Sequence, residues 1–247
     1  NSLLCRLTDM LIAKRFDAIF VVSEHLKEWL IKKYKVNPKK IYVIHNGVDP
    51  SIKPKSKPQE LVDKYKLQGK FIILYLGLLI PRKNPMFLIN LYKELKTMEN
   101  NVAIFFCGKG PLLNKLKNFT KINQLRDVVF TGIVKGSKKL DFINLSDVLV
   151  LPSTREGMPI AAVEAMACRK VVLTSRENSS NDLIENGIDG FICQNKNDYL
   201  KKLIFLKNNK SKYKKMADLS YKKIKKHFQW EKSVDAQIKV YKKLLGN

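Results

Sequence analysis

Two glutamates, Glu156 and Glu164, stand eight positions apart in the segment STREGMPIAAVEAMA. A Gly-Met-Pro turn lies between them at 157–159, and a run of small residues follows it. The apolar run at 147–152 comes just before this segment. We therefore expect a strand, a turn that carries an acid, and then a helix. In α/β proteins this order of elements forms phosphate sites, because the start of the helix faces the ligand.

The start of this helix would offer main-chain donors to an anion. Pro159 suits the first helical turn, where its missing N–H costs nothing. The amides of Ile160 and Ala161 would then be free, and the partial positive charge of the helix start would favour a phosphate. Glu156 and Glu164 would reach hydroxyls of a ligand lying across the helix start. The alternative is that one glutamate is solvated and the other caps the helix, with no ligand.

Strands and helices alternate along almost the whole chain. The apolar runs predict strands at 17–23, 40–46, 71–77, 102–108, 128–132, 147–152, 170–175 and 190–194. Residues of helical periodicity predict helices at 84–98, 111–123, 198–207, 210–228 and 230–245. This alternation favours an α/β fold with a Rossmann-like parallel sheet covered by helices on both faces.

Several short motifs occur in a fixed order along these elements. They are HNGVD at 45–49, ILYLGLLIPRKN at 73–84, FFCGKGP at 105–111, VVFTGIV at 128–134, the two-glutamate segment, NGIDGFI at 186–192 and FQW at 228–230. Their order resembles that of the retaining glycosyltransferases of family 4 (glycosyl transferases group 1). The resemblance covers most of the chain and implies the donor-binding half of a GT-B fold.

The resemblance assigns a role to each charged position of the site. It implies that Glu156 contacts hydroxyls of the donor sugar and that Glu164 accepts hydrogen bonds from the ribose. It implies that amides near Ile160 and Ala161 hold the distal phosphate and that Lys83 neutralises the diphosphate. Lys83 and Glu156 are the catalytic candidates.

The base of the nucleotide would be held by main-chain groups at Ile133 and Val134. Gly77 and Gly108 are expected to permit close approach of the main chain, with or without a ligand. The donor-binding set implied by the resemblance is Gly77, Arg82, Lys83, Gly108, Ile133, Val134, Glu156, Met158, Ile160, Ala161 and Glu164.

The sequence departs from the family pattern in three places, at Leu78, at 168–172 and at 177–179, and the first of them concerns the diphosphate. The family carries an arginine directly after the first glycine, whereas here Leu78 follows Gly77. An alkyl side chain does not replace a bidentate guanidinium, so the clamp on the diphosphate is expected to be weaker. Arg82 lies nearby, but its spacing does not match that of the family's arginine.

A proline-rich stretch divides the chain. Residues 49–60 contain three prolines and several charges, and we interpret 51–60 as an interdomain linker. By resemblance, residues 1–50 would be the remnant of the N-terminal, acceptor-binding domain, and 61–228 the nucleotide-sugar-binding domain. The segment 229–247 would be a C-terminal helix returning to the N-terminal domain. The chain begins with Asn1, so we expect a piece of a longer protein.

Some residues near these boundaries have structural interpretations. Trp230 would anchor the last helix on the N-terminal domain or pack on its own domain. Asn46 and Asp49 are expected to shape their turn through side-chain to main-chain bonds. His45 is interpreted as a hinge or turn residue.

Composition narrows the class of protein. The chain has four cysteines, of which Cys5, Cys107 and Cys193 lie in apolar surroundings, and we expect reduced, buried thiols in a cytoplasmic protein. The three histidines do not cluster with the cysteines, so no metal site is expected. No run of eighteen apolar residues occurs, and no membrane-spanning helix is expected.

The charge is strongly positive, with 47 Lys and Arg against 22 Asp and Glu, or +25. It peaks at 201–228, which is either a solvated helical face or a patch attracted to anionic lipid headgroups at the inner face of the membrane. No nucleic-acid motif accompanies the lysines, so nucleic acid is not an expected partner.

These expectations describe transfer of a glycosyl group from a UDP- or GDP-linked sugar to an acceptor hydroxyl, with retention. The acceptor would be a glycan or lipid of cell-envelope synthesis, and neither a metal nor a further cofactor would be needed. Three alternatives remain: a nucleotide-sugar epimerase of the same fold, a non-catalytic sugar-nucleotide-binding protein, and a basic adaptor for membrane or nucleic acid.

Overall fold

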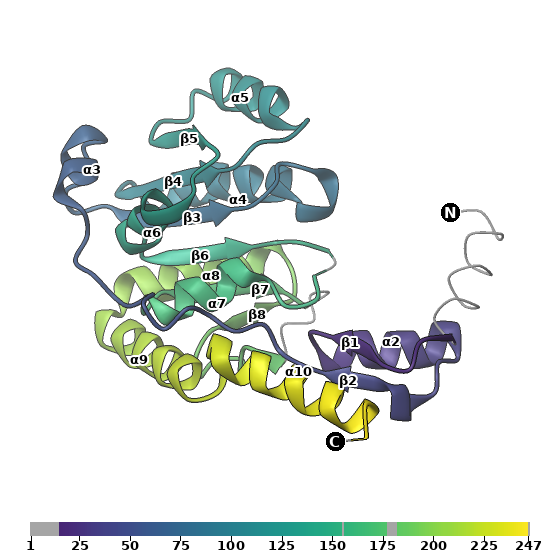
Figure 1. The fold of residues 1–247 in the computed structure, drawn as a ribbon. Coiled ribbons are helices and arrows are strands. Elements are labelled where there is room, and N and C mark those ends of the chain that lie inside the picture. Colours follow the sequence, from purple (N-terminus) through teal and green to yellow (C-terminus); the bar gives the residue numbers. More distant parts are fainter. Residues whose placement is uncertain (1–14, 155, 177–181, 247) are drawn as a thin grey trace.

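The computed structural model of the chain describes residues 15–154, 156–176 and 182–246. A six-stranded sheet of order β5-β4-β3-β6-β7-β8, parallel throughout, forms its larger part, and a two-stranded parallel sheet pairs β1 with β2 (Figure 1). The strands are β1 (Ile19–Val21), β2 (Ile41–Val43), β3 (Phe71–Leu76), β4 (Val102–Cys107), β5 (Val128–Gly132), β6 (Val148–Leu151), β7 (Val171–Ser175) and β8 (Phe191–Cys193). The predicted α/β class with a parallel sheet is confirmed.

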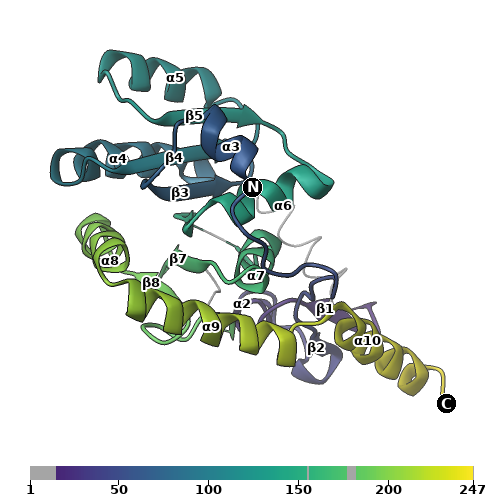
Figure 2. The same cartoon turned by 90° about the vertical axis from the view of Figure 1, so that its left-hand side faces the viewer.

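Helices separate these strands along the chain. They are α2 (Glu24–Tyr34), α3 (Gln59–Lys64), α4 (Pro85–Met98), α5 (Leu113–Ile122), α6 (Gly136–Leu145), α7 (Ile160–Ala167), α8 (Lys196–Asn208), α9 (Lys210–His227) and α10 (Trp230–Leu244), with short 3₁₀ turns at Pro38–Lys40 and Pro81–Lys83. Helices α4, α5 and α8 cover one face of the large sheet, and α6 and α7 cover the other (Figure 2).

The central strands are buried on both faces because their sequences are almost wholly apolar. In β3, Ile72 and Leu74 face the core beneath α6 and α7, whereas Ile73 and Tyr75 face the core beneath α4 and α8. All six residues of β4 are buried. Helix α9 crosses the β8 edge and contributes side chains to both cores.

The order of the strands reverses between β3 and β6, and we call the region at the carboxyl ends of these two strands the crevice. The chain lays down β3, β4 and β5 outward in one direction and then returns to place β6 on the other side of β3. The connections that leave β3 and β6 therefore diverge, and in open α/β sheets ligands bind at the carboxyl ends of such strands. The loop at 77–84 and the described parts of the next loop, 152–154 and 156–159, lie at this point.

Helix α10 lies against the small sheet (Figure 1). The ring of Tyr241 packs edge-on against Phe20 at 5.4 Å, and the Ser233 hydroxyl donates to the carbonyl of His45 at 2.7 Å. Val48 pairs with Gln229 through main-chain bonds. The Trp230 side chain is 60% exposed, so its indole does not belong to the core of the part that the structure describes, and its role as an anchor stays a prediction.

Residues 52–58 form neither helix nor strand and connect the two sheets. The domain limits drawn from the sequence stay predictions. Among the helices that the structure describes, none is both long and apolar enough to cross a bilayer.

The cysteines behave as small buried residues. Cys107, Cys168 and Cys193 are free and buried, as expected for Cys107 and Cys193, and Cys5 lies outside the described residues. Burial raises the pKa of Cys107 to about 12, which makes its thiol a poor nucleophile.

Candidate active site

Lys83 and Glu156 meet at the carboxyl ends of β3 and β6. Lys83 ends the 3₁₀ turn that follows β3, and Glu156 lies in the loop that follows β6. The Lys83 Nζ forms an ion pair with Glu156 Oε1, and the two side chains are only 21% and 10% exposed. The Thr154 amide donates to the Arg82 carbonyl at 3.0 Å, so main-chain bonding also joins the two loops. The structure thus brings both expected catalytic residues together where the strand order reverses.

The two glycine turns pack directly on each other. A Cβ at Gly108 would lie 1.9 Å from the carbonyl oxygen of Gly77, which no side chain can occupy. The Leu79 amide donates to the Lys109 carbonyl at 2.9 Å, and Leu112 donates to the Leu79 carbonyl at 3.0 Å. The expected close main-chain approach at these glycines is confirmed, and it fixes the first turn of the crevice.

Leu78 occupies an exposed position in that turn. Its side chain is 50% exposed, and the Tyr75 hydroxyl donates to its carbonyl at 2.7 Å. Burial, and to a lesser extent the charge of Glu156, raise the pKa of Tyr75, so its hydroxyl stays protonated as a donor. The buried Tyr75 hydroxyl therefore holds the main chain of this turn. The half-exposed alkyl side chain of Leu78 stands at the position where the family carries arginine.

Helix α7 starts beside Glu156. Pro159 is its N-cap, one position earlier than expected, because its φ of −70° and ψ of 118° are extended rather than helical. The Ala162 amide donates to the Pro159 carbonyl at 2.9 Å. The amides of Ile160 and Ala161 make no hydrogen bond with any described residue. As expected, the helix start presents them as donors.

Glu164 is held by a lysine that the sequence did not indicate. The Lys139 Nζ on α6 lies 2.5 Å from Glu164 Oε1, whose side chain is 9% exposed. This contact fixes the carboxylate on the α6 side of α7. In a chain with 47 Lys and Arg, no sequence signal distinguishes Lys139 from the others.

A cavity of about 430 Å³ opens next to Glu164 and Ile160. The turn after β2, the linker and the start of α10 form its other walls, which include Gly47, Asp49, Trp230 and Glu231. Three carboxylates and an exposed indole suit a ligand rich in hydroxyl groups. Periodicity could not indicate these last walls, because they come from parts of the chain distant from α7.

The remaining residues of the expected donor-binding set differ in how far their side chains are exposed to solvent. Ile133 is 50% exposed at the end of β5, whereas Val134 is 7% exposed. Met158 is 4% exposed, and its side chain belongs to the core, so only its main chain faces the crevice region. Arg82 is exposed, and its carbonyl is bound by Thr154. Arg155, beside Glu156, lies outside the described residues.

The turn after β2 is linked to this loop in a way that the sequence did not predict. Asn46 was expected to bond within its own turn, but its Nδ2 donates to the Met158 carbonyl at 2.8 Å. The expectation was wrong because folding places a carbonyl that needs a donor beside this side chain. Asp49 does shape its turn, since its Oδ1 accepts from the Ser51 amide at 2.8 Å. His45 Nε2 lies 3.2 Å from Asp182 Oδ2.

No group of three or more His, Cys, Asp or Glu suited to a metal ion occurs among residues 15–154, 156–176 and 182–246. The cations closest to the glutamates of the crevice are lysines. Independence from metal stays a prediction.

Comparison with known proteins agrees with this fold. The family model described as glycosyl transferases group 1 matches residues 57–223, and the model described as glycosyltransferase family 4 matches residues 3–52. HepE from Anabaena, solved in complex with UDP and glucose, has a TM-score of 0.88 at 18% identity. That match covers 100% of this chain and 68% of HepE, and it supports the GT-B fold.

Two curated relatives are more similar in sequence. An uncharacterized glycosyltransferase of Methanocaldococcus jannaschii is 30% identical over 230 residues, which cover 92% of this chain and 60% of that protein. The Escherichia coli UDP-Gal:alpha-D-GlcNAc-diphosphoundecaprenol alpha-1,3-galactosyltransferase is 32% identical over 195 residues, covering 75% and 49%. The chain thus spans about half to 60% of the length of these relatives. With the first of the two models matching most of its length, the chain belongs to the group 1 glycosyl transferases.

Proposed function

We propose that this chain binds the donor in a retaining glycosyltransferase, which moves a sugar from a nucleoside diphosphate to an acceptor hydroxyl. The observation that carries the proposal is the Lys83–Glu156 ion pair beside the start of α7. A cation, a carboxylate and two free amides meet there within one crevice. These groups match a ligand that carries both phosphate and hydroxyl groups.

Each group has a defined task in this proposal. Lys83 and the amides of Ile160 and Ala161 would stabilise the negative charge that develops on the leaving diphosphate. The diphosphate would compete with Glu156 for Lys83, and hydroxyls of the donor sugar would then donate to Glu156. Catalysis would thus come from electrostatic stabilisation rather than from a protein nucleophile.

Glu164 would accept hydrogen bonds from the ribose. Its carboxylate is held by Lys139 and borders the 430 Å³ cavity, so it is both fixed in place and accessible. The main chain at Ile133 and Val134 would hold the base. Such fixed donors and acceptors lower the cost of ordering the ligand.

The printed names of similar proteins support the donor and acceptor classes. The Escherichia coli relative is named for UDP-Gal and a diphosphoundecaprenol-linked acceptor, and HepE was solved with UDP and glucose. By analogy we infer a UDP-linked donor, with GDP as the alternative, and a polysaccharide or glycolipid acceptor. The acceptor site would lie largely in residues outside this chain. The proposal includes a cytoplasmic location, supported by the buried free thiols.

Leu78 favours a second candidate, a non-catalytic sugar-nucleotide-binding protein. Without the arginine of the family, the turn after β3 has one cation fewer for the diphosphate. A non-catalytic protein would bind the nucleotide but never release sugar from a nucleotide sugar. Release or transfer of sugar by the chain joined to its complete N-terminal domain separates the two candidates.

Calorimetric titration of the chain with UDP and with GDP tests the donor site. We expect saturable binding of one nucleotide, weakened roughly 10- to 100-fold in Glu164→Ala, because the ribose hydroxyls lose a charged acceptor. Lys138→Ala, an exposed neighbour of Lys139 on α6, is the matched control and should bind like the wild type. Binding of neither nucleotide, or equal binding by Glu164→Ala, would contradict the proposal.

A further inference from the structure

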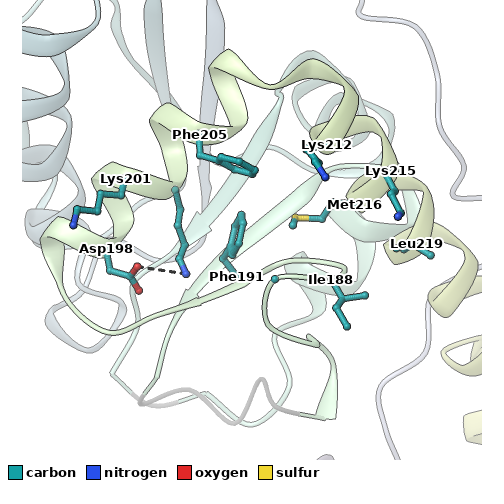
Figure 3. Close-up of a pocket in the computed structure, with 11 residues that line it drawn as sticks. Ile188, Phe191, Asp198, Lys201, Phe205, Lys212, Lys215, Met216 and Leu219 are labelled. Carbon is teal, nitrogen blue, oxygen red and sulfur yellow. Dashed lines mark ion pairs between the residues drawn. The ribbon is translucent and has the colours of Figure 1, made fainter.

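A second, larger cavity lies away from the crevice, on the side of the domain formed by β8, α8 and α9. Its volume is about 740 Å³, within the range of sites for small molecules. Phe191 of β8 and Phe205 of α8 line it with their rings edge-on to each other, at 6.3 Å between ring centroids, and Met216 of α9 points into it (Figure 3). Phe205 is 39% exposed and Ile188 at the mouth is 46% exposed. The floor of the cavity is therefore apolar and open to solvent.

Lysines surround this apolar floor. Lys201 and Lys202 come from α8, and Lys212 and Lys215 come from α9 (Figure 3). Lys202 pairs with Asp198 at 3.4 Å and lies over the Phe191 ring. The other three lysines make no ion pair with any residue that the structure describes. The rim thus carries three positive charges that are not neutralised by neighbours.

The whole surrounding segment has the same sign of charge. Residues 201–228 contain eleven lysines and one acidic residue, Asp218. Like charges on neighbouring helices repel one another, so an anionic surface placed against them would relieve this repulsion. Charge complementarity therefore specifies an anion, and the apolar floor specifies that the anion also carries a hydrophobic group.

We propose that this cavity takes up part of an anionic phospholipid of a bilayer and thereby holds the domain on the membrane surface. The lysines of the rim would contact the phosphate, and Phe191, Phe205 and Met216 would contact the hydrocarbon. Each lysine near an anionic bilayer contributes about 1 kcal/mol, and side chains such as Phe and Leu insert at the boundary of headgroups and acyl chains. A nucleic acid would use the lysines but not the apolar floor.

The cavity shares no lining residue with the crevice at Lys83 and Glu156. Binding of lipid and binding of nucleotide can therefore be measured separately on the same variants. Variants of the cavity should titrate with UDP or GDP like the wild type. If the wild type bound neither nucleotide, the proposed donor site would be contradicted, but the proposal of a lipid site would not be affected.

Flotation of the chain with vesicles tests the lysine rim. Vesicles of phosphatidylcholine alone should not bind it, whereas vesicles with equal parts of phosphatidylglycerol should. The double variant Lys212→Glu/Lys215→Glu should lower partitioning at least roughly tenfold. Lys115→Glu/Lys117→Glu on α5 changes the net charge equally on another face and should cost less than about threefold. An equal loss in both variants would overturn the proposal, because net charge alone would then explain binding.

A second pair of variants tests the apolar floor. Phe205→Ser should weaken partitioning several-fold, whereas Ile122→Ser, which removes a 79% exposed side chain from α5, should not. Far-ultraviolet circular dichroism and thermal melting verify that both variants are folded. Three results would each overturn the lipid site. They are unchanged partitioning of Phe205→Ser, equal binding of the wild type to vesicles of phosphatidylcholine alone, and release of the chain from anionic vesicles by single-stranded RNA as effective as release by added vesicles.

Discussion

Lys83 Nζ and Glu156 Oε1 form an ion pair that bridges the loops after β3 and β6. The two residues are 73 positions apart in sequence, and the reversal of strand order brings them together. Because both side chains are mostly buried, the pair differs from an ordinary surface salt bridge. In the donor site that we propose, a diphosphate would displace Glu156 from Lys83 and a sugar hydroxyl would displace Lys83 from Glu156.

Substitutions of Lys83 and Glu156 should have non-additive effects on the free energy of unfolding. Lys83→Met leaves the Glu156 carboxylate buried without its cation, so it should destabilise the chain more than Lys83→Met/Glu156→Gln does. A double-mutant cycle by urea unfolding should give a coupling energy of about 1–3 kcal/mol. Purely additive effects would show that the pair contributes nothing to the fold.

Lys139 should act through Glu164. Lys139→Met removes the cation that fixes the Glu164 carboxylate, so affinity for the nucleotide should fall roughly tenfold. The same substitution should have almost no effect in a Glu164→Gln background, which calorimetry can measure. Lys138→Met is the control on the same helix. An equal loss in both backgrounds would show instead that Lys139 contacts the ligand directly.

Gly47 should be required for docking of α10. A Cβ there would lie 2.6 Å from the main-chain carbonyl of Gln229, so Gly47→Ala must displace the start of α10. We expect a loss of about 1–3 kcal/mol in the free energy of unfolding. In a Trp29→Phe background, Trp230 is the sole tryptophan, and its emission should shift. Unchanged emission and stability would contradict the tight packing of these segments.

Lys170 should make stability depend on pH. Burial lowers the pKa of Lys170 to about 8, although its Nζ donates to the Asn144 carbonyl at 2.8 Å. Between pH 8 and the ordinary value of 10.5, the unfolded chain keeps this proton and the folded chain loses it. The contribution of Lys170 to the free energy of unfolding therefore rises across this window, by up to about 3 kcal/mol.

Urea unfolding of the wild type and Lys170→Met at several pH values measures this contribution. The stability of the wild type relative to Lys170→Met should increase from pH 8 to 10.5, whereas Lys138→Met should show no such trend. A difference independent of pH would mean that Lys170 keeps an ordinary pKa. Lys170→Met also lacks the hydrogen bond to the Asn144 carbonyl, which lowers its free energy of unfolding by an amount that does not depend on pH.

The sequence predicted the elements of the fold well, because local signals determine them. Apolar runs such as FIILYL and VAIFFC are strands in the structure, and the periodicity at 84–98 matches α4 within one residue. The order of motifs also placed Lys83 and Glu156 in one site. Strand ends and the cap at Pro159 differ by one to three residues, since they depend on single hydrogen bonds.

Contacts between distant segments were not predictable from the sequence. Lys139 carries no signal in so basic a chain, and only packing of α6 on α7 selects it. Asn46 has a strong local preference to bond in its own turn, but the carbonyl of Met158 satisfies it instead. The walls at Gly47 and Trp230 depend in the same way on how α10 returns.

The affinities of a nucleoside diphosphate and its monophosphate for the same chain show whether the crevice holds a diphosphate. With UDP and UMP, or GDP and GMP if guanine is the base bound, the wild type should prefer the diphosphate by at least roughly tenfold. Lys83→Met should abolish this preference, and Lys109→Met, an exposed lysine of the neighbouring turn, should keep it. Equal affinities in the wild type, or an unchanged preference in Lys83→Met, would contradict a donor site at the Lys83–Glu156 pair.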